Sequence, residues 1–391
     1  MIINPYTPGA GLVPNYLAGR DDTIAEATEV IAYVAHGYPA RSIVYYGLRG
    51  VGKTVLLNKI EDIADDNDVL YEHIEVSERS SFKIAISLHI QKLIKQMSVK
   101  EKAKGYVQKA MGILKAFKIT YSPEGEVSIG LNEDVAAAVG ISDTGNFVND
   151  LTELFVSMGT LAKNSDSSVC LFIDEMQFLK DDEFEALITA LHRVNQKGLP
   201  VTLFAAGLPK IAKIAGDIKS YAERLFHFVS IDSLTQEAAK LALVEPAKKV
   251  GVTFTEKAID EILRITEGYP YFLQEYGKQV WNFINDKEID ITAVKAAYPI
   301  FEKSLDDSFF KVRYDRATPR EKEFMLAMVE CGDLPCTIAE IADKMHAKVQ
   351  KISPLRAQLI YKGFIYATSY GEVDFTVPQF NRYLKRIHAI K

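Results

Sequence analysis

The segment GLRGVGKT, from Gly47 to Thr54, constrains this chain more than any other feature. It matches the pattern G-x-x-x-x-G-K-[ST] in full, with a short β-rich run before it and a segment of helical periodicity after it. Glycines let backbone N–H groups converge on phosphate oxygens, and the following helix adds the positive end of its dipole. The sequence therefore predicts a phosphate-binding loop between a strand and a helix.

We expect this loop to bind ATP or ADP together with Mg²⁺. The Lys53 ammonium should reach the β- and γ-phosphates and assist catalysis, and the Thr54 hydroxyl should ligate Mg²⁺. The residues predicted to hold the nucleotide here are Gly47, Gly50, Gly52, Lys53, Thr54 and Val55.

A pair of carboxylates follows a second apolar run, SVCLFIDE, from Ser168 to Glu175. Adjacent acidic residues at the end of an all-apolar strand are hard to explain by packing. We expect Asp174 to hold Mg²⁺ through water and Glu175 to polarise the water that attacks ATP. The two motifs together predict an ATPase.

The first 232 residues alternate between strand and helix patterns, which predicts an α/β fold. The strands are nearly continuous apolar runs, as in a doubly wound parallel sheet covered on both faces. The predicted strands lie at residues 42–47, 69–76, 168–175 and 200–207, and the predicted helices between and around them lie at 23–36, 54–65, 82–97 and 182–198.

One stretch interrupts that order. Residues 117–131, FKITYSPEGEVSIGL, alternate in period two around a Pro-Glu-Gly turn, which predicts an inserted hairpin. A surface decoration is the favoured interpretation, and an arm that touches a partner or DNA is the alternative.

The pattern becomes helical after residue 232. Thr235 and Thr255 are expected to cap two helices, and Gly268 is expected to end the second of these. Three helices and a pair of short strands then predict a winged helix-turn-helix, with its third helix starting at Ser353-Pro354. The predicted domains are a nucleotide-binding domain at 1–232, a helical lid with a connector at 233–316, and a winged helix at 317–391.

The C-terminal domain carries a local positive charge. It holds eleven Lys or Arg against eight Asp or Glu, whereas the whole chain has a net charge of −6. The basic residues on and near its third helix are Lys348, Lys351, Arg356 and Lys362, and they favour contact with duplex DNA. A protein-contact or regulatory module is the alternative, because winged helices serve both purposes.

An arginine after the fourth strand suggests contact between copies of the chain. In SYAERLF, Arg224 is placed to reach the γ-phosphate of a neighbouring subunit and neutralise charge in the transition state. This interpretation predicts a homo-oligomer in the ATP state. The alternative is a surface pair between Glu223 and Arg224.

Targeting signals are missing from the sequence. The N-terminus has no basic start or long apolar run, and no segment is long enough to span a bilayer, so we expect no membrane partner. Three cysteines favour a reducing, cytoplasmic location over a disulfide framework. Cys331 and Cys336 lack further ligands at zinc spacing and are interpreted as packing residues.

Taken together, the segments LAGRDDTI, FIDEMQ, SYAERLF, GYPYFLQEYGKQVW and FTVPQF resemble bacterial AAA-family ATPases related to origin-recognition initiators and STAND signalling ATPases. The resemblance covers essentially the whole chain. It implies an AAA-type core, a helical lid and a C-terminal winged helix. It also implies that Gly19 and Arg20 lie near the adenine and ribose.

Two departures from that resemblance concern the γ-phosphate. The fourth strand ends in Ala205-Ala206-Gly207 where a polar sensor is usual, and the lid reads Gly268-Tyr269-Pro270-Tyr271 where an arginine is usual. We therefore expect slow hydrolysis and a nucleotide-dependent switch coupled to DNA. The alternatives are a STAND-like switch with a regulatory winged helix and, with weaker support, a protein-remodelling ATPase.

Overall fold

The computed structural model describes residues 3–98, 104–121 and 136–389. They pack into two compact units. The first comprises Met1–Gly19, Leu48–Gly52 and Asp232–Lys391, and the second comprises Arg20–Gly47 and Lys53–Ile231. The tip of the phosphate loop thus belongs with the C-terminal half of the chain, although the strand before it and the helix after it belong to the second unit.

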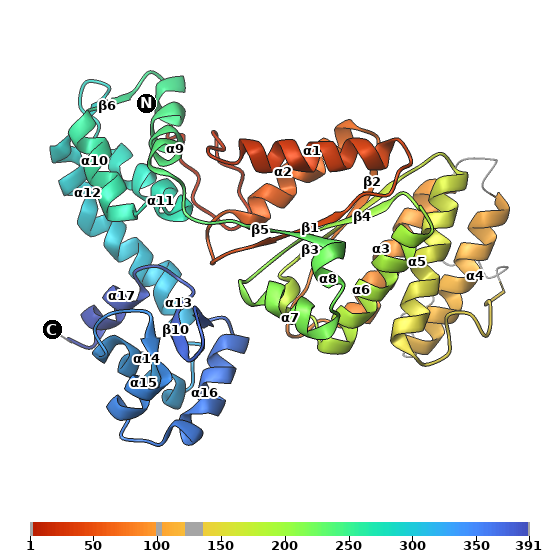
Figure 1. The fold of residues 1–391 in the computed structure, drawn as a ribbon. Coiled ribbons are helices and arrows are strands. Elements are labelled where there is room, and N and C mark those ends of the chain that lie inside the picture. The colour runs from red at the N-terminus through yellow and green to blue at the C-terminus, as the bar shows by residue number, and fades with distance from the viewer. Residues whose placement is uncertain (1–2, 99–103, 122–135, 390–391) are drawn as a thin grey trace. The chain divides into compact units, whose positions relative to one another are not determined.

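The second unit is built on a parallel sheet, as predicted, but the sheet has five strands because β5 (Phe226–Ser230) joins the four that were predicted (Figure 1). Its strands are β1 (Ser42–Tyr46), β2 (Leu70–Glu75), β3 (Val169–Asp174), β4 (Val201–Gly207) and β5 (Phe226–Ser230), in the order β2-β3-β4-β1-β5. Every residue of β3 and β4 is buried. Phe204 pairs with Ile43 on one side and with Phe172 on the other, so β4 joins the strands that carry the two predicted motifs.

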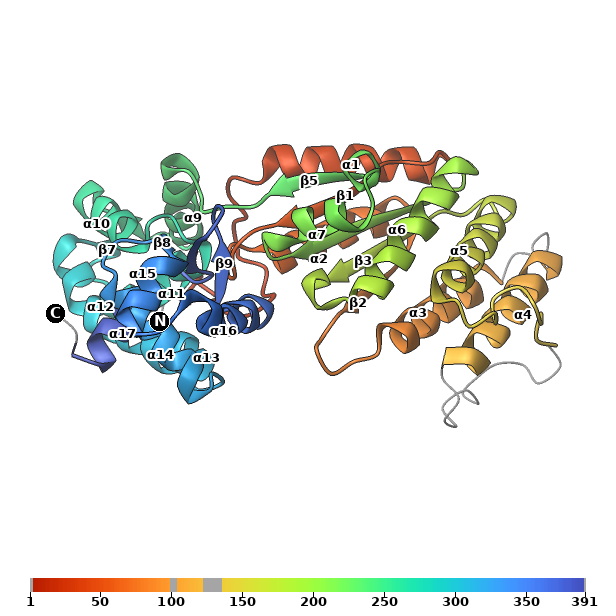
Figure 2. The ribbon, with the colours of Figure 1, turned by 60° about the horizontal axis from the view of Figure 1, so that its bottom comes forward.

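Helices cover both faces of this sheet, because central parallel strands bury their side chains on both sides. In Figure 1, α1 and α2 lie above the sheet and α6 and α7 lie below it. Helices α3, α4 and α5 form a group beside the β2 edge in Figures 1 and 2. The helices are α1 (Asp21–Ala35), α2 (Lys53–Asp66), α3 (Phe82–Met97), α4 (Lys104–Tyr121), α5 (Phe147–Asn164), α6 (Asp181–Gln196), α7 (Lys210–Ile218) and α8 (Ala222–Leu225).

The predicted hairpin at 117–131 is wrong for its first five residues. Residues 117–121 form the last turn of α4, where Phe117 is buried and Tyr121 Oη donates to Asp150 Oδ2 at 2.6 Å. The apolar residues that alternate in sequence also fall on one side of a helix, since Phe117 and Tyr121 are four positions apart and their rings lie 4.7 Å apart. Residues 122–131 lie outside the described residues.

The first unit contains the helical lid. Its helices are α9 (Gln236–Lys249), α10 (Glu256–Thr266), α11 (Pro270–Val280) and α12 (Ile291–Ser304), with a 3₁₀ turn (Trp281–Phe283) and a two-stranded pair of β6 (Thr253–Phe254) and β7 (Glu288–Ile289). Thr235 and Thr255 cap α9 and α10 as predicted, each accepting a backbone N–H at 3.3 Å. Glu267 ends α10 in the left-handed conformation, one residue before the predicted Gly268.

The segment after α12 is helical, although the sequence suggested a connector. Residues Leu305–Phe310 form a π-helix, which continues into α13 (Lys311–Tyr314). Phe310 stacks on Tyr383 with ring centroids 5.3 Å apart, and Phe309 stacks on Tyr271 at 4.7 Å. The wider turn therefore presents two successive phenylalanines, one to the C-terminal domain and one to the lid.

The C-terminal domain has the predicted order of three helices followed by two strands. It comprises α14 (Pro319–Glu330), β8 (Cys336–Thr337), α15 (Ile338–Lys344), α16 (Val349–Tyr361), β9 (Ile365–Ala367), β10 (Glu372–Phe375) and α17 (Phe380–Ile387). Strand β8 was not predicted and gives the sheet order β8-β10-β9. Helix α16 begins four residues before the predicted Ser353, and Pro354 lies inside it. Ile352 is fully buried and anchors that extra turn.

Candidate nucleotide site

The phosphate loop connects β1 to α2 and is shaped by two glycines. Gly50 has φ of +84° and Gly52 has φ of +94°, values that side chains with a Cβ rarely adopt. At the end of the loop, Lys53 Nζ donates to Gly47 O at 3.0 Å, so the lysine folds back along the loop. Gly47 N–H in turn donates to Gly207 O at 3.1 Å, which ties the start of the loop to the end of β4.

Thr54 and Asp174 meet although 120 positions separate them in sequence. Thr54 Oγ1 donates to Asp174 Oδ2 at 2.6 Å, and Asp174 is 4% exposed. A hydroxyl and a carboxylate at this spacing are the hard oxygen ligands that Mg²⁺ prefers. No group of three or more His, Cys, Asp or Glu that could hold a metal occurs in the part of the chain that the structure describes. Thr54 and Asp174 supply two oxygen donors, which fits an ion whose other ligands would include nucleotide phosphates.

Glu175 adopts a strained backbone conformation directly after β3. Its φ is +52°, in the left-handed region that non-glycine residues seldom occupy. Its N–H donates to Asp174 Oδ1 at 2.7 Å, and its carboxylate accepts a hydrogen bond from Gln177 Nε2. Such strain costs of the order of 1–3 kcal/mol and gathers at functional sites.

The region that carries these residues matches a known family. Residues 16–204 match the family described as AAA ATPase domain. The chain contains an AAA ATPase domain. Residues 307–384 match a family described as a domain of unknown function, and no curated protein matches the chain.

One solved structure supports the fold. A Walker-type ATPase of Pyrococcus abyssi is similar over 94% of this chain and 96% of its own, with 15% identity and a TM-score of 0.54. The structure of the Aeropyrum pernix Orc1 protein in complex with DNA is similar over 95% of this chain and 94% of its own, with 15% identity and a TM-score of 0.46. Cdc6p from Pyrobaculum aerophilum covers 97% and 96% with 13% identity and a TM-score of 0.49. Nucleotide binding and ATPase activity follow from the AAA domain, which the sequence predicted.

Arg20 and Val55 are also predicted from the sequence to contact the nucleotide. Arg20 is the residue before the first turn of α1 and is half-buried. Val55 lies in the first turn of α2 and is also half-buried. Their contact with a nucleotide stays a prediction.

Arg224 lies exposed on the short helix α8. The backbone on both sides of it is held by Arg41, whose Nη2 donates to Glu223 O at 2.6 Å and to Phe226 O at 2.5 Å. Arg41 was not singled out from the sequence, because a long-range bond from a side chain to backbone leaves no motif. These two bonds hold the backbone on both sides of Arg224, while the Arg224 residue itself is exposed.

The four basic residues predicted to face DNA have different surroundings. Lys362 Nζ lies 2.9 Å from Glu321 Oε1, and Glu321 is completely buried. The Arg356 Nε atom is buried and has no hydrogen-bond partner among the described residues. Lys348 and Lys351 are exposed near the start of α16. Lys362 and Arg356 are therefore at least partly engaged with the interior of the domain itself.

The lid contributes a residue that the sequence flagged without assigning a role. Tyr269 is 1% exposed and covers Gly50, where a Cβ would lie 3.0 Å from its Cε1 atom. Its hydroxyl is buried without a hydrogen-bond partner in the described ranges, and burial raises its pKa well above the usual value for tyrosine. The Gly-Tyr-Pro-Tyr segment thus packs directly on the tip of the phosphate loop.

The described residues contain no helix that combines the length and the apolar character needed to cross a membrane.

Asp174→Asn should weaken Mg²⁺-dependent ATP binding by about 10- to 100-fold, because the amide keeps the shape but loses the charge that orients the metal's ligands. Equilibrium binding of a fluorescent ATP analogue with Mg²⁺ and with EDTA measures the effect. Asp182→Asn, at an exposed position on α6, is the matched control. An unchanged Mg²⁺ dependence in the Asp174 variant would contradict the assignment.

Glu321→Gln should destabilise the C-terminal domain by about 1–3 kcal/mol at pH 7, because Lys362 would lose its buried partner. Burial alone would raise the pKa of Glu321, but hydrogen bonds from Lys362 and Thr318 lower it overall. A lowered folded-state pKa contributes stability above the unfolded pKa, near 4.3, which is lost as pH falls through the folded value. Hydrogen exchange of α14 and α16 at pH 7 and near pH 4 checks that the variant's deficit shrinks in acid. Glu323→Gln, whose carboxylate pairs with Arg320 in solvent, should cost almost nothing.

Proposed function

We propose that the protein is a slow ATPase that works as a nucleotide-dependent switch, with its C-terminal winged helix as the moving output. The observation that carries this proposal is a direct contact between that domain and the phosphate loop. Arg49 N–H donates to Thr376 O at 3.4 Å. Thr376 is fully buried, and its hydroxyl donates to Gly363 O at 2.6 Å, so this contact reaches the interior of the C-terminal domain.

The tip of the loop is enclosed by both parts of the first unit. Gly50 lies under Tyr269 of the lid, and Leu48 lines a cavity of about 270 Å³ together with Glu267, Tyr366, Asp374, Phe375 and other residues of the lid and C-terminal domain. A change of loop conformation on nucleotide binding would therefore alter contacts with both. This arrangement gives the bound nucleotide a physical route to the C-terminal domain.

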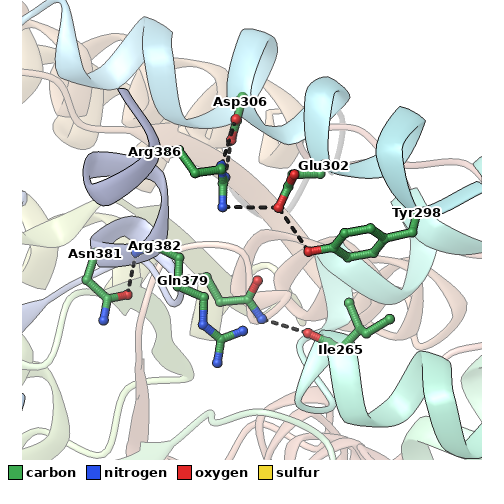
Figure 3. A network of polar contacts seen from close by, with 8 residues as sticks. All are labelled: Ile265, Tyr298, Glu302, Asp306, Gln379, Asn381, Arg382 and Arg386. Atoms are coloured by element: carbon green, nitrogen blue, oxygen red, sulfur yellow. Dashed lines mark hydrogen bonds and ion pairs between the residues drawn. The ribbon is translucent and has the colours of Figure 1, made fainter. Parts of the chain in front are cut away.

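Ion pairs and a hydrogen bond connect the lid and the segment after it to the C-terminal domain (Figure 3). Arg386 bonds Asp306, with Nε 3.1 Å from Oδ2, and its Nη1 lies 3.2 Å from Glu302 Oε1. Arg382 Nη2 lies 2.8 Å from Glu267 Oε1. Gln379 Nε2 donates to Ile265 O at 2.7 Å. These polar bonds on the surface of a mostly aromatic contact are suited to a docking that can be released.

Slow turnover is part of the proposal because two positions that the family resemblance places near the γ-phosphate lack the residue types usual there. The end of β4 presents Ala205, Ala206 and Gly207, all buried and without a polar side chain. Tyr269, and not an arginine, follows Gly268 in the lid. We expect a turnover number below about 1 s⁻¹, the lower end of the usual range.

Loss of the ion pairs between the C-terminal domain and the lid should make the protein release nucleotide faster. Arg382→Ala with Arg386→Ala removes the ion pairs to the lid and should raise the dissociation rate of a fluorescent ADP analogue about tenfold, which corresponds to about 1.4 kcal/mol. Added salt should speed release from the unmodified protein and have less effect on the variant. Arg320→Ala removes an Arg–Glu pair within the C-terminal domain and is the control. Equal release rates for all three proteins would reject the switch.

DNA binding is a second candidate output, favoured by the exposure of Lys348 and Lys351 at the start of α16. If these lysines contact phosphates, Lys348→Ala with Lys351→Ala should reduce the slope of log affinity against log salt by about 2. Filter binding of duplex DNA, with and without ATP, measures the slope. Lys257→Ala with Lys295→Ala, both exposed in the lid, is the matched control. Absent or salt-independent binding would reject DNA and leave the regulatory output.

A further inference from the structure

One buried glutamine links the strained Glu175 to the end of β4. Gln177 lies in the 3₁₀ turn (Met176–Phe178) after β3 and is 4% exposed. Its Nε2 donates to Glu175 Oε2, and its Oε1 accepts from Leu208 N–H at 3.0 Å. The side-chain amide therefore spans from the carboxylate to the first residue beyond β4.

The two bonds fix the orientation of this amide. Leu208 offers an N–H, which requires the carbonyl oxygen of Gln177 on that side. The NH₂ group must then face Glu175, whose carboxylate can accept but not donate when ionised. A flipped amide would place two donors together at Leu208 and two acceptors together at Glu175. Gln177 thus presents its NH₂ group to the Glu175 carboxylate in one orientation only.

The backbone at the end of β4 makes room for this amide. A Cβ on Gly207 would lie 2.7 Å from Gln177 Oε1 and 2.1 Å from Ile211 Cδ1. Both are shorter than any ordinary contact, so a side chain at this position would push the amide out of place. The absence of a side chain at Gly207, which looks like a lost sensor in the sequence, accommodates a polar group that arrives from β3.

We propose that Gln177 is the positioning residue for Glu175 and that it occupies the space which Gly207 leaves open at the end of β4. The inference rests on the proposed hydrolysis of ATP by this site. With one carboxylate oxygen held by Gln177, the Glu175 side chain keeps one orientation toward the attacking water. Leu208 leads directly into α7, so the same amide ties that orientation to the segment that precedes Arg224.

Two substitutions separate positioning from packing. Gln177→Met fills the same volume without donating to Glu175, and it should lower kcat by about 10²-fold through misplacement of the carboxylate. The dissociation constant for the ATP analogue should stay within about twofold, because the phosphate loop is untouched. Gln177→Glu should move the acidic limb of the pH–kcat profile to higher pH, since two adjacent carboxylates resist ionising together. A packing role would produce neither the split between kcat and affinity nor the shift of the profile.

A control and a readout without turnover complete the experiment. Gln279→Ala removes a similar Gln–Glu bond in the lid, from Nε2 to Glu275 Oε1 at 2.7 Å, and should leave kcat unchanged. In protein labelled with ¹⁵N-glutamine, the Gln177 side-chain signal, identified by its loss in Gln177→Met, should shift in Glu175→Ala.

Unchanged kcat in Gln177→Met, or an unshifted amide signal, overturns this inference alone. If the unmodified protein neither binds nor hydrolyses ATP, the proposed function fails as well.

Discussion

Strand β4 holds the nucleotide site together because it pairs with β1 on one side and β3 on the other. The phosphate loop follows β1 and Asp174 is the last residue of β3, but these two strands do not pair with each other. The register of β4 therefore decides whether Thr54 and Asp174 meet. It also places Gly207 O beside Gly47 N–H and Leu208 N–H beside Gln177. One fully buried strand without a catalytic side chain thus positions the start of the phosphate loop, the strand that carries Asp174, and Gln177.

Much of this arrangement could be predicted from the residues. The phosphate loop and the Asp-Glu pair have strong local signatures, since glycines and terminal carboxylates at these positions satisfy few other demands. The parallel sheet followed from apolar runs separated by helical patterns. The threonine caps of α9 and α10 were also correct, because capping depends on a few neighbouring residues.

The parts that sequence reasoning missed depend on distant contacts or on ambiguous periods. At residues 117–121 an apolar spacing fitted both a strand and a helix, and the helix prevailed because Phe117 and Tyr121 pack into the core. Lys362 looked like a surface cation because Glu321 is 41 positions away in the sequence. Gln177 lies within a recognised motif, but its partner Leu208 directly follows another strand. No local pattern reveals such a bond.

The first unit also contains the tip of the phosphate loop. Residues Leu48–Gly52 cluster with the lid and the C-terminal domain, although the chain enters and leaves them from the second unit. A change in the conformation of these five residues would therefore alter contacts inside the first unit directly.

The π-helix at Leu305–Phe310 has a consequence for how this chain can change over evolution. A π-turn accommodates one residue more than an α-helical turn. An extra residue that is absorbed in this way leaves the chain before and after it nearly in register, whereas one extra residue in an α-helix would rotate everything after it by about 100° relative to α12. Phe310 can therefore stack on Tyr383, and Arg386 can face Asp306 and Glu302, in a segment one residue longer than an α-helix would allow. The segment thus tolerates a change of chain length that an α-helix would pass on to the C-terminal domain.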